Sequence, residues 1–191
     1  MAVAPQLDDA TRSSIADQIG QMLPPVDQDA LPLAQEPLLA LGESLPIMVL
    51  PLDAVRRGDQ ALSEAVRFTG RWHHQVEGPE GFVSARSVDH GEEHEVVEVA
   101  ASAIPDDLAR TVRWIDENMP GDQLATMLIV PDYYLTAIML RSAAGDQVVV
   151  SQVPERLAEL RPDQVYEGRQ FISLLGQYPP SAGIPDEGQF G

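Results

Sequence analysis

Apolar residues near the start of the chain recur at helical spacing. The positions of Ile15, Ile19 and Met22 predict a helix over residues 10–23, with an aspartate just before it as the cap. Prolines interrupt residues 26–44, where we expect short helical pieces joined by bends.

The middle of the chain alternates between apolar and polar positions. Three segments follow this pattern, at Phe68–Val76, Phe82–Val88 and His94–Ser102, and turn-forming residues separate them. We expect an antiparallel three-strand meander. A short apolar segment, Leu45–Leu52, precedes it, and its two prolines place it at the edge of a sheet.

Helical spacing returns after the meander. An apolar stripe predicts a helix over residues 105–119, and Pro120-Gly121 ends it. Further elements are expected as strands at 125–131, 133–142 and 147–153, then helices at 154–160 and 163–176.

This order predicts an α+β fold rather than a βαβ repeat. We expect one antiparallel sheet, made of the three-strand meander, a helix and two to three further strands. It packs against helices and carries an N-terminal helical segment. The expected organisation is a helical, proline-interrupted segment at 1–44, the α+β domain at 45–176, and an extended or disordered tail at 177–191 whose removal would leave the melting temperature almost unchanged.

The run Met127–Leu140 is apolar on both faces of the strand that it predicts, which is typical of a strand covered by two layers. The helices at 105–119 and 163–176 can supply one layer, and the helix at 10–23 part of the second. We therefore expect a protein partner or a second copy of the chain, in a homo-oligomer, to cover the remainder.

Charge and composition exclude several functions. The 191 residues contain 30 acidic residues against 12 basic ones, all arginine, for a net charge of −18. Such a surface repels nucleic-acid phosphates and anionic lipid. The absence of cysteine excludes thiolate and Cys–zinc chemistry, and the absence of lysine excludes a Schiff base.

Two further features of the sequence indicate where in the cell the protein resides. The first residues lack the charged and apolar regions of a signal peptide, and no apolar run is long enough to insert into a membrane. We expect a cytoplasmic protein, and arginine use without lysine indicates a bacterial source.

All four histidines lie between positions 73 and 94. Because imidazole is a common metal ligand, this segment is a candidate metal site. His73 and His74 point to opposite faces of their strand, and the expected register separates His74 from His94 by roughly 13 Å. We therefore expect no metal and no other cofactor. The alternative is a site at the following turn, formed by His90, Glu93 and His94.

Asp132 interrupts the longest apolar run, between Pro131 and Tyr133-Tyr134. A carboxylate and two phenols in that context are candidate ligand-binding residues, and Tyr133 and Tyr134 should face opposite sides. Neither a G-x-S-x-G elbow nor a G-x-G-x-x-G loop is present.

The sequence thus favours a non-catalytic accessory or protein-interaction module, such as one subunit of a larger assembly. Two alternatives remain open. One is a metal-assisted, hydrolase-type enzyme that uses the His90/His94 turn, and the other is a small-ligand-binding domain. A bound divalent metal would favour the first, and a deep apolar cavity would favour the second.

Overall fold

The computed structural model of the chain describes residues 2–3, 7–23, 40–58, 60–78, 81–91, 93–100, 103–119 and 123–181. The helices are α1 (Asp9–Met22), α2 (Leu52–Arg57), α3 (Leu62–Ala65), α4 (Ala103–Asn118) and α5 (Gly168–Leu175). The strands are β1 (Ala2–Val3), β2 (Ala40–Val49), β3 (Arg67–Gly78), β4 (Gly81–Asp89), β5 (His94–Ala100), β6 (Gln123–Val130), β7 (Leu135–Ser142), β8 (Gly145–Gln152) and β9 (Val165–Glu167). A 3₁₀ turn, η2 (Pro131–Tyr133), joins β6 to β7.

The strands form one mostly antiparallel sheet, which confirms the α+β class. Its order is β5-β4-β3-β2-β6-β7-β8-β9, and β1 pairs with β6 off this path. The parallel pairs are β2 with β6 and β1 with β6. None of the described helices has the length and apolar character needed to cross a bilayer.

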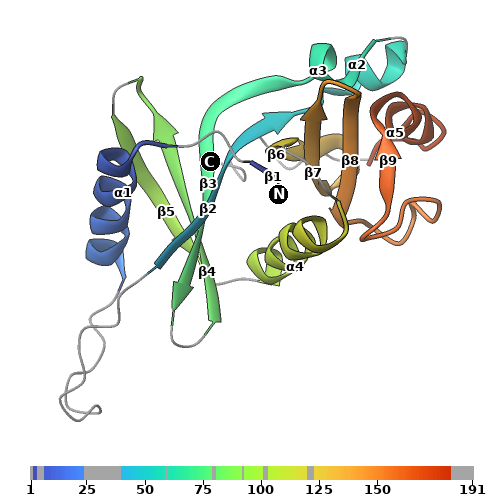
Figure 1. The fold of residues 1–191 in the computed structure, drawn as a ribbon. Coiled ribbons are helices and arrows are strands. Elements are labelled where there is room, and N and C mark those ends of the chain that lie inside the picture. The colour runs from blue at the N-terminus through green and yellow to red at the C-terminus, as the bar shows by residue number, and fades with distance from the viewer. Residues whose placement is uncertain are drawn as a thin grey trace.

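The helices lie on two faces of the sheet (Figure 1). Leu45 and Ile47 of β2 pack in a cluster with Leu108 and Ile115 of α4. The opposite face packs against α2, α3 and α5 over the strands β6–β8, and against α1 over β3–β5. We call β3–β5 with α1 the wing, and β6–β9 with the other helices the body.

Both covering layers of the body belong to this chain. Leu128, Ala137 and Met139 face the cluster under α2, α3 and α5, while Met127 and Ile138 face α4. The expectation of two covered faces is therefore confirmed, but the expected layers were wrong: α4 and α5 lie on opposite faces, and α1 covers β3–β5 instead of the body. The apolar run gives no evidence for a partner chain, because this chain's own helices fill both layers.

β2 is a central strand, so the expected edge position was wrong. It pairs with β3 on one side and with β6 on the other. Pro46 is tolerated because its missing N–H falls where β2 and β3 lose register and just before the β6 pairing begins at Ile47. The bulge contains Gly70 at φ 73°, and the Thr69 hydroxyl donates to the Ile47 carbonyl at 2.9 Å.

The last third of the chain departs from the expected helices. Residues 154–160 form turns, and the segment 163–176 divides into β9 and α5. Helical spacing misled here because buried Tyr166 belongs to a short strand, whereas Phe171, Ile172 and Leu175 belong to the helix.

Two expected boundaries also fall inside ordered structure. The division at residue 44 lies within β2. Residues 177–181 are held on the body: the Tyr133 hydroxyl donates to the Tyr178 carbonyl at 3.2 Å, and the Ser181 amide donates to the Asp132 carbonyl at 2.7 Å. We therefore no longer expect truncation after Gly176 to be harmless; residues 182–191 lie outside the described part of the chain.

Two glycines in helices, Gly168 of α5 and Gly20 of α1, provide a matched test of how closely these helices pack on their neighbours. A Cβ at Gly168 would lie 2.9 Å from Cβ of Leu62 and 3.2 Å from Cβ of Asp146, whereas a Cβ at Gly20 would meet nothing within 4 Å. We expect Gly168→Ala to destabilise the protein by about 1–3 kcal/mol through overpacking. Gly20→Ala should stabilise it by up to about 1 kcal/mol, as helix propensity predicts.

Urea unfolding followed by circular dichroism measures both changes. A stabilising Gly168→Ala would contradict the close approach of α3, β8 and α5.

Candidate functional site

A chain of four polar side chains runs through the interior of the wing. His74 of β3 shares hydrogen bonds with the Ser44 hydroxyl of β2, at 2.9 Å from Nδ1, and the Ser87 hydroxyl of β4, at 2.7 Å from Nε2. The Ser87 hydroxyl also lies 3.3 Å from Nδ1 of His94 in β5. We call these four residues the histidine–serine chain; it links all four strands of this half of the sheet.

The chain is buried and its inner imidazole is neutral. His74 and Ser87 have no exposed surface. Burial lowers the pKa of His74 to about 3, and the nearby cationic forms of His73 and His94 act in the same direction. A neutral imidazole has one donor and one acceptor nitrogen, which matches its two serine partners.

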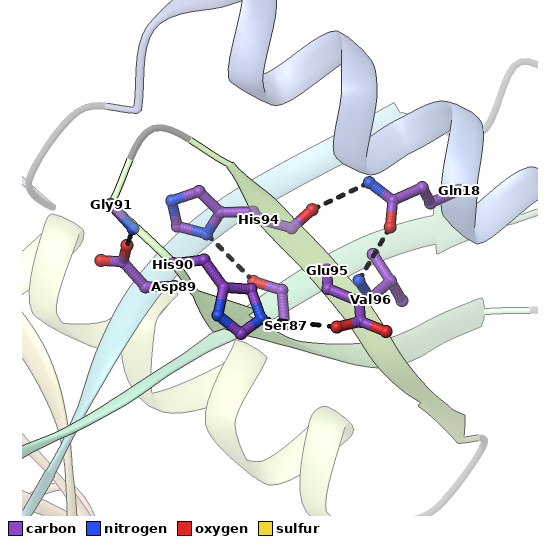
Figure 2. A network of polar contacts seen from close by, with 8 residues as sticks. All are labelled: Gln18, Ser87, Asp89, His90, Gly91, His94, Glu95 and Val96. Atoms are coloured by element: carbon purple, nitrogen blue, oxygen red, sulfur yellow. Dashed lines mark hydrogen bonds and ion pairs between the residues drawn. The ribbon is translucent and has the colours of Figure 1, made fainter.

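Helix α1 covers the histidine–serine chain. Its Ile15 and Ile19 pack on Val76, Ala85 and Val96 of the sheet. Figure 2 shows how Gln18 of α1 reaches the backbone of β5. The Gln18 amide donates to the His94 carbonyl at 2.9 Å and accepts from the Val96 amide at 2.9 Å.

Helix α1 also binds strand β2, through the side chain of Arg12. The Arg12 guanidinium donates to the Leu41 carbonyl at 2.7 Å and to the Gly42 carbonyl at 3.2 Å. Gln18 and Arg12 therefore satisfy backbone groups of β5, the edge strand of the sheet, and of the end of β2 that lies outside its pairing with β6. The helix itself begins at Asp8, whose carboxylate accepts from the Thr11 amide at 2.7 Å.

The opposite face of the wing carries a second buried histidine. Leu45, His73, Arg86 and Glu98 stand in one row across β2–β5. Burial lowers the pKa of His73 to about 4, and the Arg86 cation adds to this shift. Arg86 forms an ion pair with Glu98 at 3.1 Å.

A small cavity lies between α4 and the sheet. It has room for about one water molecule, far less than a small-molecule site, and it is lined by Glu43, Leu45, Val112, Ile115, Ala125 and Ile138. Burial raises the pKa of Glu43 at its margin, and the Asp116 carboxylate adds to that shift. Neither His73 nor His74 lines this cavity.

The expected register of the meander was one residue off in each of its two pairings. It set Val88 opposite Gly70 and His94 opposite Val88, but the pairs are Arg71 with Val88 and Asp89 with His94. The two errors cancel, so His94 remains about four residues along the sheet from His74, as expected. The two imidazoles nevertheless share a partner, because Ser87 lies on their face of β4 at a position between theirs.

The alternative metal residues point in different directions (Figure 2). His90 is exposed and pairs with Glu95 at 3.4 Å, whereas His94 turns inward, with its ring 5.7 Å from Trp72. Glu93 is exposed, and its backbone carbonyl accepts from the His90 amide. Within the described residues, no three histidine, aspartate or glutamate side chains gather as metal ligands.

The expected ligand-binding residues at η2 also lie in different environments. Tyr133 is buried in the body, while Tyr134 is 42% exposed and has φ 52°. Asp132 is partly exposed on the 3₁₀ turn. Burial raises the pKa of Tyr133, and the Asp132 carboxylate adds to it. Sequence reasoning placed the tyrosines on opposite sides of a strand; the turn achieves the same separation.

Cations gather around α2, a feature that residue order does not reveal. Arg57 donates to Asp53 at 2.8 Å, and Arg67 of β3 adds to the lowering of the Asp53 pKa that this bond produces. Arg156 lies 6.0 Å from the Tyr133 ring, and Arg56 acts on the same tyrosine. We define the arginine surface as exposed Arg56, Arg57, Arg67 and Arg156 with exposed Phe68 and Tyr134.

Burial of two neutral histidines predicts a loss of stability in mild acid. Below the ordinary pKa of 6.5, the unfolded chain binds protons that folded His73 and His74 do not. The free energy of unfolding should fall by up to about 1.4 kcal/mol per pH unit for each histidine between pH 6.5 and about 5.

Urea titrations at a series of pH values measure this slope. His90→Gln is the control, because exposed His90 should leave the slope unchanged. A flat profile across this interval would show that the two imidazoles are not buried in neutral form.

Comparison with protein-family models, with curated proteins and with solved structures finds no match to this chain. Its own side chains are therefore the evidence for what it does. Two features stand out among them: the buried histidine–serine chain under α1 and the exposed arginine surface around α2.

Proposed function

We propose that the chain is a non-catalytic protein-interaction module, and that its arginine surface binds an acidic segment of a partner protein. One observation carries this proposal. Four of the twelve basic residues lie around α2 in a protein whose net charge is −18.

The chemistry of the surface suits carboxylates. A guanidinium presents paired donors that match the two oxygens of a carboxylate, and it stays charged at any relevant pH. Asp53 already shows this pairing within the surface, through its bond to Arg57. A glutamate or aspartate of a partner could engage Arg56 and Arg67 in the same way, whereas the Arg156 guanidinium already donates to the Pro179 carbonyl and the Ser181 hydroxyl.

Exposed aromatic rings give the arginine surface an apolar component as well. Phe68 is 47% exposed next to Arg67, and Tyr134 is 42% exposed next to Tyr133. Arginine and aromatic side chains are the residues that most often dominate binding energy at protein interfaces. A partner segment with both acidic and apolar residues therefore fits this surface better than a purely acidic one.

The charge of the remaining surface favours correct docking. An acidic segment is repelled by most of a protein with charge −18 and attracted to the arginine surface. This asymmetry raises specificity and the association rate more than affinity. The salt dependence of binding should therefore be strong.

Fluorescence anisotropy with a labelled peptide of Glu, Asp and Leu residues tests the proposal. We expect saturable binding that weakens as salt rises, and little binding of the same peptide with Gln and Asn in place of the acids. In Arg56→Gln/Arg67→Gln the Kd should rise by about tenfold or more, since each lost charged hydrogen bond contributes about 1.5–3 kcal/mol.

A matched control changes the net charge by the same amount elsewhere. Arg113 on α4 and Arg169 on α5 are both exposed, so Arg113→Gln/Arg169→Gln should change the Kd by less than about twofold if binding is local. Equal weakening by both pairs would contradict a defined recognition surface. Tighter binding of single-stranded DNA than of the acidic peptide, or arginine-dependent self-association in light scattering, would also overturn the proposed partner class.

A further inference from the structure

The wing contains a second device that is independent of the arginine surface. A buried chain of hydrogen bonds lies directly beneath a helix with few attachments, and two members of that chain can gain a proton. We propose that α1 is a pH-sensitive cover: protonation of the histidine–serine chain releases α1 from the wing while the body stays folded.

The attachments of α1 are few. It fully buries two apolar side chains, Ile15 and Ile19, in a cluster with three buried residues of the sheet, and Leu7, Leu23, Leu41, Val83 and Val99 pack around this cluster partly buried. Among the described residues, its hydrogen bonds to the sheet are those of Arg12 to β2 and Gln18 to β5. Helices with so few buried contacts open at lower free energy than the rest of a protein.

The groups around His74 disfavour its charge. Ser44 of β2 and Ser87 of β4 are neutral partners, whereas the neighbouring groups with electrostatic influence on it are His73 of β3, His94 of β5 and Arg12 of α1. All three of the latter are cations or become cations in acid. Asp8 at the start of α1 interacts with His94, which lies farther toward the surface.

Hydrogen bonding alone does not block protonation of the chain. A doubly protonated His74 would donate to both serine oxygens, and Ser87 could still donate to Nδ1 of His94. The cost lies in placing a charge under α1 without water, so hydration of the imidazole requires α1 to move away. Gln18, which binds the backbone on either side of Glu95, would be released in the same motion.

The size of the effect follows from the pKa difference. His74 has a pKa of about 3 under α1 and would return to about 6.5 once hydrated. Lowering the pH from about 7.5 to 5 should therefore favour the open state by roughly thirtyfold from this histidine alone. The open state would uncover Val76, Ala85 and Val96 of the sheet.

Hydrogen exchange measured by mass spectrometry on the full chain tests the proposal. After correction for the intrinsic pH dependence of exchange, α1 should lose protection by roughly thirtyfold between pH 7.5 and about 5. Amides of β7 should stay protected, and so should those of α4, which packs on the opposite face from α1.

His74→Gln keeps an amide between the two serines but cannot titrate, so most of the acid-induced loss in α1 should disappear. His90→Gln is the control and should retain the full loss, because His90 is exposed at the next turn. The wild-type profile is decisive even if His74→Gln fails to fold. Protection of α1 that does not change with pH, or that is lost together with protection of β7, would overturn the proposal.

Discussion

Three backbone pairs between β2 and β6 join the two halves of the sheet: Ile47 with Met127, Met48 with Leu128, and Val49 with Ile129. On its other side β2 pairs with β3 over most of its length, but with two losses of register. β2 therefore belongs to both halves. The sheet continues from β2 into the wing through β3, and into the body through β6.

The two halves bury very different amounts of apolar surface. The body contains two clusters, with twenty and nine buried residues, whereas the wing cluster has five. Since buried apolar area is the main source of stability, the wing should be the weaker unit. The buried histidines add to this difference in acid, and α4, which also touches β4, is the main helical connection between the halves.

Both proposals depend on this division. Most of the arginine surface lies on the more stable half, because it surrounds α2, whose Ala54 and Val55 are buried in the larger cluster of the body. Arg67 and Phe68 come from the first residues of β3, the strand next to β2. The cover α1 stands on the less stable half. A recognition surface benefits from rigid support, because a rigid surface loses less conformational freedom on binding. A helix that detaches from the sheet instead requires a part of the fold that opens at low free energy.

Sequence patterns predicted the fold class because the alternation along β3–β5 and the apolar stripe of α4 are strong local signals. They failed where tertiary structure overrides local preference. Pro46 is typical of an edge, yet β2 is central because a bulge removes the need for its N–H. Tyr166 fits a helical stripe but lies in β9.

The candidate sites were harder to predict than the fold. The expected offset between His74 and His94 was right, but it did not show that Ser87, which lies between them on β4, contacts both rings. The arginine surface was hidden for a different reason. Arg156 is far from Arg56 and Arg67 in the sequence, and only the folded chain brings Arg56 and Arg156 to the same side chain, Tyr133.

Native-state hydrogen exchange at neutral pH, with increasing guanidinium below the unfolding transition, tests the division of the sheet most directly. The amides of α1, β4 and β5 should converge on one free energy of opening, lower than that of β6, β7 and β8, which should open only with global unfolding. A single free energy shared by all strands would show that β2 makes the sheet one cooperative unit, and would contradict the division into wing and body.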